Sequence, residues 1–492
     1  MMREYQSIVE AIMDHGEMTP DKVAFYFEEY VYTYARLAGE IRKAAGWLKA
    51  NGITQGQRVL VEAVYSPAYV VLCYGIHLSG AVFVPIECGT PAQRVEELKT
   101  ILETDKAILQ EPGNTGALSL NDTFEQIIHF DGPDNGYRLP DPGAMVEILF
   151  TTGTTGKSKG VMVSHRNQVT MALAGIEGCK LEEDNVWLIA TPMNHAGGLR
   201  KMHMSMFRGS TTCLVDGMRN LKEYFRVAHD RGVTSLFLPP AAVHIMLTFA
   251  RKEMAGLKDQ LRFIYSSSAV YPQHDKDEMK KLLPGVCMYN VYGASECGLV
   301  AIVDFNHGQD IPGSVGKALS YSKITVLDEQ YREIGHSSAE HYGLLGVRSA
   351  SVMMEYWREP ELTASVIRDG MLVLSDNGYY DEEGRIILIG RSNDVINIGG
   401  YKVAPNEVEE IVRSLDEIDD CLLIPAGKGN VPILKLLVVM KPGCEPDEKA
   451  IVRYLSEKLE AYKLPKKIVK IDAIEKTFNG KTDRKKMIAM YQ

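Results

Sequence analysis

A polar stretch at residues 151–160 carries side chains that suit the binding of phosphate. It reads Thr-Thr-Gly-Thr-Thr-Gly-Lys-Ser-Lys-Gly and lies between two short apolar runs, 148–150 and 161–163. Hydroxyl groups, lysine ammonium groups and free backbone N–H groups all donate hydrogen bonds to phosphate oxygens. Its glycines let the backbone come close to a ligand, because no Cβ stands in the way. The stretch therefore predicts a phosphate-binding loop, although a flexible polar surface loop has the same composition.

A Walker-type loop is a second alternative for this stretch. The Walker pattern needs four residues between its first glycine and Gly-Lys-Ser, whereas only two separate Gly153 from Gly156. The order of residues instead resembles the phosphate loop of the adenylate-forming (AMP-binding) superfamily, which includes acyl- and aryl-CoA synthetases, nonribosomal adenylation domains and luciferases. The resemblance implies that the loop holds ATP phosphates, and that Thr152 also contacts the metal. The loop residues expected to bind ATP are Thr151, Thr152, Gly153, Thr154, Thr155, Gly156, Lys157 and Lys159.

A second motif, Tyr292-Gly-Ala-Ser-Glu296, places a carboxylate just after an aromatic ring and a glycine. The carboxylate could bind Mg²⁺ and the ring could stack on adenine, but a β-turn with a solvated glutamate has the same residues. The Gly-x-Ser-x-Gly elbow of serine hydrolases is excluded, because Cys297 takes the last glycine position. The motif resembles the superfamily's Tyr-Gly-x-Thr-Glu, which implies that Glu296 binds Mg²⁺ and Tyr292 binds adenine. The same match implies that Ser295 contacts the α-phosphate or the acyl carboxylate.

The segment Ser266-Ser-Ser-Ala-Val-Tyr-Pro272 falls where members of the superfamily carry a Gly-Gly-Ala-type loop against adenine and the acyl chain. The resemblance implies that Ser268 and Ala269, together with Gly293 of the second motif, lie beside the nucleotide. Serines replace the glycines here, which puts the shape of the pocket in doubt but not its location.

Asp376 is the expected ligand of the ribose. The superfamily usually has Thr-Gly-Asp at this place, with a glycine eight residues after the aspartate. Asp376 and Gly384 keep that spacing, while Leu374-Ser375 replaces Thr-Gly. A carboxylate suits this role because its two oxygens match two hydroxyl donors. An exposed turn aspartate is the alternative.

The segment from Gly390 to Glu409 resembles the junction between the large and small domains of the superfamily. By that match Arg391 binds the ribose or a phosphate, and Lys402 stands where an arginine is frequent. A hinge is expected at Asn393, because asparagine tolerates unusual backbone angles.

A C-terminal stretch, Lys476-Thr-Phe-Asn-Gly-Lys-Thr-Asp-Arg, resembles the superfamily's Pro-Lys-Thr-x-x-Gly-Lys-x-x-Arg motif, with Glu475 in place of proline. The match implies that Lys481 is the catalytic lysine, carried to the acyl carboxylate and the α-phosphate. A basic surface tail is the alternative for an isolated lysine-rich segment. The motifs occur in the expected order along the whole chain, and their joint occurrence excludes the alternatives.

Thr191-Pro-Met-Asn-His-Ala-Gly-Gly198 occupies the segment that lines the acyl pocket in the superfamily. Amino-acid activators usually carry an aspartate there, whereas Asn194-His195 resembles acyl- and aryl-CoA ligases. This implies a fatty or aromatic acid without an α-amino group and a catalytic role for His195, although a structural histidine remains open.

The resemblance implies two half-reactions with ATP, Mg²⁺ and CoA. The acid attacks the α-phosphorus of ATP to give an acyl-adenylate and pyrophosphate, and a thiol then displaces AMP. A basic cluster, Lys463, Lys466, Lys467, Lys485 and Lys486, suits either the phosphates of CoA or an acidic acyl or peptidyl carrier protein. Loading of a phosphopantetheinyl carrier therefore remains an alternative. A non-catalytic nucleotide-binding protein is a further alternative, but the presence of Lys481, Glu296 and Asp376 together argues against it.

Strand and helix patterns alternate through most of the first 300 residues, which predicts parallel sheets covered by helices. We expect two α/β subdomains, a β-barrel-like subdomain over roughly 312–390 and a small mobile α+β domain. The predicted domains are 1–390, for AMP binding and adenylation, and 391–492, which carries the catalytic lysine. One apolar segment, 69–86, could be mistaken for a membrane span, but it is better explained by a helix ending near Gly80 and a strand over 81–84.

The chain has 492 residues, ordinary globular composition and a formal net charge of −10. The negative charge argues against nucleic acid or an anionic membrane as a partner. Eight cysteines are scattered without Cys-x-x-Cys pairs, and the N-terminus lacks a signal-peptide core. We therefore expect a cytoplasmic protein with reduced thiols and no membrane span.

Overall fold

The computed structural model describes residues 3–132, 138–152, 158–268, 271–391, 394, 396–398, 401–427, 433–477 and 481–491. Of Thr152 and Lys402 only the backbone is described. The predicted residues that lie outside the described ones are Gly153, Thr154, Thr155, Gly156, Lys157, Ala269 and Asn393.

A six-stranded sheet, in the order β6-β5-β3-β4-β7-β8, forms the first subdomain. Its strands are parallel except for the antiparallel pair of β7 and β8, which flanks the predicted phosphate loop. The strands are β3 (Arg58–Glu62), β4 (Val82–Ile86), β5 (Ala107–Leu109), β6 (Leu118–Ser119), β7 (Met145–Thr152) and β8 (Ser158–Ser164). The helices of this part are α1 (Ile8–Met18), α2 (Tyr34–Ala50), α3 (Pro67–Ser79), α4 (Ala92–Leu102) and α5 (Leu120–Ile128).

Helix α3 shows how the sequence sets these elements. The Ser66 side chain accepts a hydrogen bond from the N–H of Tyr69, and Gly80 ends the helix with φ of 80°. A serine at the N-cap and a left-handed glycine at the end are the usual boundaries of a helix. Every residue from Pro67 to Leu78 is buried, which explains why this apolar segment resembles a membrane span in sequence.

A fourteen-stranded sheet forms the rest of the large N-terminal part, in the order β16-β17-β19-β20-β15-β14-β13-β12-β11-β9-β10-β1-β2, with β18 paired to β19. Its strands are β1 (Val23–Phe27), β2 (Tyr30–Thr33), β9 (Val186–Ile189), β10 (Thr211–Leu214), β11 (Ser235–Phe237), β12 (Phe263–Ser266), β13 (Cys287–Ala294), β14 (Gly298–Asp304), β15 (Ser314–Ala318), β16 (Lys323–Leu327), β17 (Gly343–Arg348), β18 (Ile367–Arg368), β19 (Met371–Tyr380) and β20 (Ile386–Arg391). The helices are α6 (His165–Cys179), α7 (Ala196–Arg208), α8 (Leu221–Asp230), α9 (Pro240–Phe249), α10 (Arg251–Gly256), α11 (Gln273–Leu282) and α12 (Pro360–Val366).

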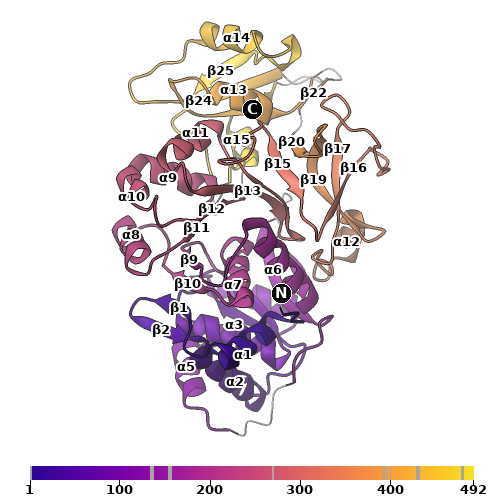
Figure 1. Ribbon diagram of the computed structural model, residues 1–492. Coiled ribbons are helices and arrows are strands. Elements are labelled where there is room, and N and C mark those ends of the chain that lie inside the picture. Colours follow the sequence, from indigo (N-terminus) through magenta and orange to yellow (C-terminus); the bar gives the residue numbers. More distant parts are fainter. Residues whose placement is uncertain are drawn as a thin grey trace.

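Two pairings in this sheet join distant parts of the chain. The hairpin of β1 and β2 joins the second sheet through parallel pairing of β1 with β10, although it lies among the elements of the first subdomain in sequence. The β-rich part continues the same sheet, because β15 pairs with β20. Figure 1 shows the yellow C-terminal part at the top, the pink and orange parts side by side below it, and the purple first subdomain at the bottom.

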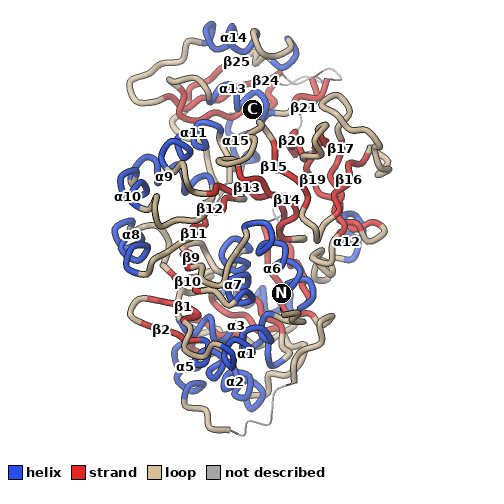
Figure 2. The backbone as a smooth tube through the Cα atoms, in the orientation of Figure 1, coloured by secondary structure: helices blue, strands red, loops and turns tan. Residues whose placement is uncertain are grey.

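The C-terminal part has its own small core, which includes Val408, Leu436 and Ile451. A three-stranded sheet of β23, β24 and β25 is packed with helices (Figure 2). Its elements are β21 (Ile396–Ile398), β22 (Tyr401–Val403), α13 (Pro405–Arg413), β23 (Ile418–Ala426), β24 (Ile433–Met440), α14 (Glu448–Ser456), a 3₁₀ turn (Ala461–Lys463), β25 (Lys467–Lys470) and α15 (Arg484–Tyr491). The predicted fold class, a large α/β portion followed by a small α+β domain, is confirmed.

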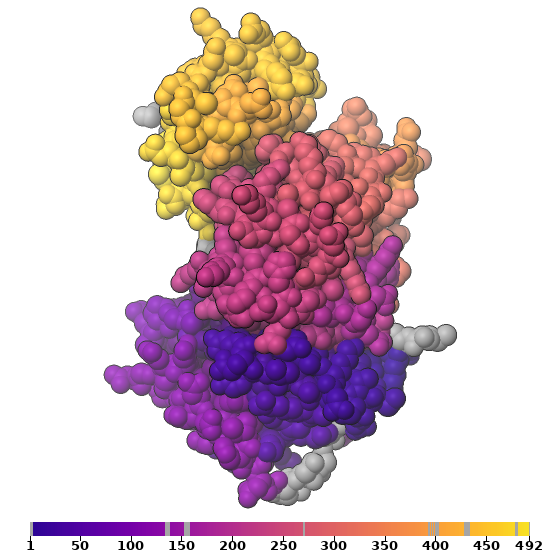
Figure 3. Space-filling model, turned by 60° about the vertical axis from the view of Figure 1, so that its left-hand side comes forward, coloured from indigo at the N-terminus to yellow at the C-terminus, as the bar shows by residue number. Residues whose placement is uncertain are grey.

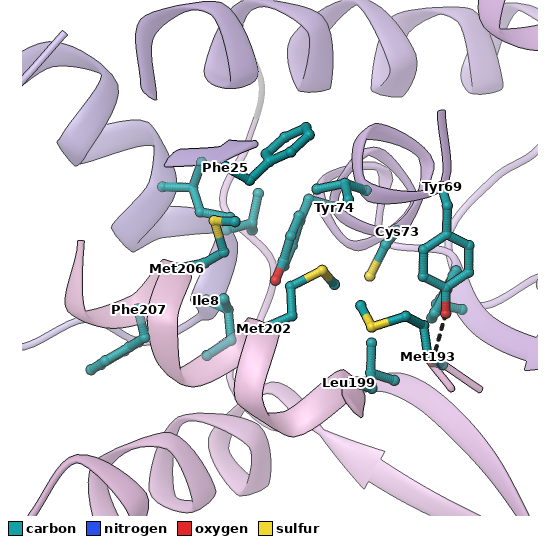
Figure 4. Packing of buried hydrophobic residues seen from close by; sticks show 14 of the residues in the cluster. Ile8, Phe25, Tyr69, Cys73, Tyr74, Met193, Leu199, Met202, Met206 and Phe207 are labelled. Carbon is teal, nitrogen blue, oxygen red and sulfur yellow. Dashed lines mark hydrogen bonds between the residues drawn. The ribbon is translucent and has the colours of Figure 1, made fainter. Parts of the chain in front are cut away.

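The main core lies where the helices of the two α/β subdomains meet. Figure 4 shows methionines of α7 packed against aromatic residues of α3 and β1. The hydroxyl of Tyr69 donates a buried hydrogen bond of 2.8 Å to the carbonyl of Met193, which fixes the segment before α7 to α3. Within the described part of the chain, no helix is long and apolar enough to cross a membrane.

Candidate active site

A cleft of about 2750 Å³ lies between the N-terminal part and the C-terminal part. Its walls come from α9, α11, β13 and β20 on one side and from α13, β23 and the segment before α15 on the other. Figure 3 shows the yellow C-terminal part seated on the pink and orange surface of the larger part. Six of the predicted site residues line this one cleft: Ser268, Tyr292, Gly293, Asp376, Arg391 and Lys481.

Asp376 stands between Tyr292 and Arg391. The Tyr292 hydroxyl donates a hydrogen bond of 3.0 Å to Oδ2, and Nε of Arg391 lies 3.6 Å from Oδ1. Asp376 and Arg391 are direct partners in the antiparallel ladder of β19 and β20, so the backbone itself brings these two charges together. Burial, followed by the charge of Asp376, raises the pKa of Tyr292 well above its usual range and keeps the hydroxyl protonated as a donor.

Gly293 lies near the end of β13, and Ser295 lies in the turn that joins β13 to β14. The ladder shifts register between Tyr292 and Gly293, as at a β-bulge. A Cβ on Gly293 would stand 1.9 Å from the carbonyl oxygen of Gly298, so only glycine fits this close approach. Bulges are frequent beside active sites because they redirect side chains. This bulge separates Tyr292 from Ser295, which is half-buried in the turn.

Glu296 follows in the same turn, and Tyr356 holds its side chain. The Tyr356 hydroxyl donates a hydrogen bond of 2.7 Å to Oε1 of Glu296, and the N–H of Met353 donates to the Glu296 carbonyl. The ammonium of Lys159, from the predicted phosphate loop, stands 5.2 Å from the centroid of the Tyr356 ring. Tyr356 thus connects two predicted phosphate and metal ligands. Sequence reasoning missed it, and no motif in the sequence points to it.

Ser268, just after β12, has a φ of +84°. This left-handed region favours glycine, and other residues there carry strain that the surroundings must hold. The resemblance implied a glycine loop at this segment, and Ser268 has a backbone conformation that favours glycine although the residue is serine. Beside it the Ser266 hydroxyl is buried and finds no hydrogen-bond partner among the described residues.

Lys481 comes from the C-terminal part and reaches the charges of the larger part. Burial, and next the charge of Arg391, lower its pKa from the usual lysine value, while Glu296 and Asp376 act in the opposite direction. The N–H of Thr477 donates a hydrogen bond of 2.6 Å to the Lys481 carbonyl. The lysine therefore lies within electrostatic reach of three predicted site residues.

His195 lies at the N-cap of α7, where the charge of Lys481 acts on it. Burial lowers the pKa of His195, and the positive charge of Lys481 lowers it further. A neutral imidazole at this position can accept or donate a hydrogen bond without adding charge. The preceding residue, Asn194, is buried and uncharged.

Comparisons with known proteins identify the family of this chain. A family model described as AMP-binding enzyme matches residues 13–357, and one described as AMP-binding enzyme C-terminal domain matches residues 407–481. Indoleacetate–CoA ligase of Aromatoleum aromaticum is 26% identical over 494 residues, covering 95% of this chain and 94% of its own. Long-chain-fatty-acid–CoA ligase of Bacillus subtilis is 26% identical over 531 residues, covering 97% and 93%.

A fatty acid–[acyl-carrier-protein] ligase, ScoC of Streptomyces coeruleorubidus, is 25% identical over 522 residues, covering 98% of this chain and 96% of its own. Among solved structures, ATP-bound MatB from Rhodopseudomonas palustris superposes with a TM-score of 0.89 over 99% of both chains at 23% identity, which shows the shared fold. On these matches the chain belongs to the family of AMP-binding enzymes.

Proposed function

We propose that this chain is an AMP-forming ligase that activates a carboxylic acid without an α-amino group as an acyl-adenylate and then transfers the acyl group to the thiol of CoA. One observation carries the proposal. Lys481, from the C-terminal part, lines the same cleft as Asp376 and Arg391 of the larger part. The charges of Arg391, Glu296 and Asp376 all act on its ammonium group.

In the first half-reaction an anionic carboxylate attacks the anionic α-phosphate of ATP, and pyrophosphate leaves. The protein must neutralise the charge that repels the attack and align the reacting atoms. Lys481 supplies a positive charge from the C-terminal part, and Lys159 supplies another from the phosphate loop. Asp376 accepts the ribose hydroxyls, while the hydrogen bond from Tyr292 fixes the direction of its carboxylate.

Glu296 fits the magnesium ion that such chemistry requires. Magnesium prefers one or two carboxylates together with waters and phosphate oxygens. Tyr356 occupies Oε1 of Glu296, and Oε2 has no recorded hydrogen bond among the described residues, which leaves it available as a ligand. The ion would neutralise charge on the departing phosphates, and Thr152 is the second proposed ligand.

In the second half-reaction a thiol attacks the carbonyl carbon of the acyl-adenylate and AMP leaves. Lys481 is no longer needed at the α-phosphate, so a rotation of the C-terminal part could withdraw it and admit the thiol. Asn393, the proposed hinge, lies outside the described residues.

The choice of acid and acceptor follows from the residues near α7 and the C-terminal surface. Asn194 offers no negative charge to an α-ammonium group, which favours a fatty or aromatic acid. Of the basic cluster, Lys463 is already paired with Glu407 at 2.7 Å and Glu460 at 2.9 Å. Lys485 lines the cleft. A carrier protein is the second candidate acceptor, since one relative carries that acceptor in its name.

A screen of pyrophosphate release over a panel of fatty, aromatic and amino acids tests the proposal. Each acid is incubated with Mg·ATP and either CoA or a phosphopantetheinyl carrier protein. The expected result is release that depends on a non-amino acid, with AMP and an acyl-CoA as products. Loading of the carrier alone would favour the second candidate, and no release with any acid would contradict both.

A further inference from the structure

Helix α7 carries a buried lysine that the proposed chemistry does not use. Lys201 is only 5% exposed and lies on the helix that begins beside His195. The two residues are six positions apart, which corresponds to about 9 Å along the helix axis. Lys201 is therefore buried about one and a half turns below the reacting end of the proposed acyl site.

Two aromatic rings surround its ammonium group. Nζ stands 4.6 Å from the ring centroid of Phe237 and 4.3 Å from that of Tyr265. These residues are direct partners on the parallel strands β11 and β12, so both rings face the helix. Beyond their carboxyl ends, the two strands lead to Pro240 and Ser268, which line the cleft. The ammonium thus lies one layer beneath the cleft wall.

No carboxylate compensates this charge. Within the described ranges, Lys201 has neither an ion pair nor a hydrogen bond recorded at Nζ, and the one acidic group acting on it is the thiol of Cys179. Burial raises the pKa of that thiol to about 12, so it is neutral. Burial lowers the pKa of Lys201 to about 7. The charge of Arg200 acts in the same direction, and the Cys179 thiol acts in the opposite one. An unpaired buried ammonium costs free energy that an anionic ligand would recover.

The other buried lysine and arginine side chains of the described chain differ in this respect. Arg200, the neighbour of Lys201, lies 2.6 Å from Oε1 of Glu147. Lys276 lies 3.2 Å from Asp310. Each of these buried cations has a carboxylate from the chain itself, and Lys201 does not.

Gly197 lies on α7 between His195 and Lys201. It stands four residues before Lys201, so both lie on the same face of α7. A Cβ on Gly197 would come within 3.2 Å of the Phe237 ring, so any larger residue would crowd the space between helix and ring. The face of the helix between His195 and Lys201 therefore carries no bulky side chain at this position.

We propose that Lys201 is a specificity-determining residue that binds a second carboxylate at the far end of the acid. The proposal rests on the proposed function and narrows it to long dicarboxylic acids. One carboxylate lies at Lys481 and His195 and reacts with ATP. The other replaces the missing counter-ion of Lys201, while Phe237 and Tyr265 hold the ammonium in place.

The test compares suberate with octanoate, which differ in the second carboxylate alone. For the wild-type enzyme, kcat/KM for pyrophosphate release should be about 10- to 100-fold higher with suberate, as one charge-assisted hydrogen bond provides. Lys201→Met should abolish this preference, mainly through a higher KM for suberate. Lys222→Met, which removes an exposed lysine on α8, serves as the matched control and should leave the ratio unchanged.

Three outcomes are separable. A wild-type enzyme that prefers octanoate, or a Lys201→Met variant with an unchanged suberate-to-octanoate ratio, overturns the role of Lys201 while the ligase proposal stands. Absence of pyrophosphate release with any acid contradicts the ligase proposal, and this inference with it. The wild-type preference needs no variant, so the test holds even if Lys201→Met does not fold.

Discussion

The hydroxyl of Tyr292 donates a hydrogen bond of 3.0 Å to Oδ2 of Asp376, a residue 84 positions further along the chain. The aspartate is also 3.6 Å from Arg391, so its carboxylate is oriented from two sides before any ligand binds. Preorganised acceptors of this kind bind a ligand without further ordering.

Replacing Asp376 by alanine should therefore weaken the binding of ATP. We expect KM for ATP to rise about 10- to 100-fold, because a charged acceptor of the ribose hydroxyls is lost, with KM for the acid little changed. Tyr292→Phe should raise KM for ATP only a few-fold, because the Asp376 carboxylate remains and loses only the hydrogen bond that orients it. Initial rates of pyrophosphate release measure both, and the exposed Asp131→Ala is the control. An unchanged KM for ATP in Asp376→Ala would contradict the ribose assignment.

Lys481→Ala should separate the two half-reactions. Adenylation should slow by roughly 10²-fold or more, as expected when one preorganised charge at the transition state is removed. Thioester formation from a supplied acyl-adenylate should be spared. Lys449→Ala, which removes an exposed lysine on α14, controls for general effects on the C-terminal domain. Equal loss in both steps would refute the role of Lys481.

The pH profile of adenylation should reflect the lowered pKa of Lys481. The charged ammonium is the active form, so kcat/KM for ATP should fall as the pH rises through a pKa below the usual lysine value. Arg391→Met removes a positive neighbour and should shift this falling limb to higher pH. Asp376→Asn removes a negative neighbour and should shift it to lower pH. Limbs that stay fixed in both variants would show that another group titrates.

The buried pair of Glu147 and Arg200 should dominate the acid sensitivity of the fold. Burial opposes ionisation of Glu147, but Arg200 and His203 overcome it and lower its pKa from 4.5 to about 2. Because the pKa of Glu147 is lower in the folded state than in the unfolded state, its ionised carboxylate stabilises the fold above pH 4.5. This contribution to the free energy of unfolding, about 3 kcal/mol, is lost as the pH falls toward 2.

Arg200→Met should consequently destabilise the fold by about 3–5 kcal/mol at neutral pH, because Glu147 stays buried without its partner. Urea unfolding monitored by circular dichroism measures the free energy of unfolding of the wild type and the variant. Arg226→Met, which breaks an exposed ion pair with Glu223, should change it little. Similar losses in the two variants would refute the distinction between buried and exposed pairs.

Local elements could be predicted from the sequence where a short-range signal defines them. The helix expected to end near Gly80 is α3, and Ser66 and Gly80 mark its ends. Long-range pairings could not be predicted in this way. The parallel pairing of β1 with β10 joins residues almost 200 positions apart, as in Phe25 with Thr212, and no local pattern encodes it.

The same limit applies to the candidate site. The resemblance named Glu296 and Lys159, but only the fold shows that Tyr356 contacts both. Lys201 was missed for another reason. Polar residues occur on all sides of α7, which in a sequence suggests a solvent-exposed helix. In the structure the helix is buried on all sides, and Lys201 is buried with it.

The most direct test of the central claim follows an oxygen atom. The account holds that the carboxylate of the acid attacks the α-phosphorus of ATP, so one oxygen of the acid must stay with AMP when the thiol takes the acyl group. An acid labelled with heavy oxygen is turned over with Mg·ATP and CoA, and the products are analysed by mass spectrometry. We predict label in AMP and none in pyrophosphate. Label in inorganic phosphate together with ADP, or no labelled AMP, would contradict the account.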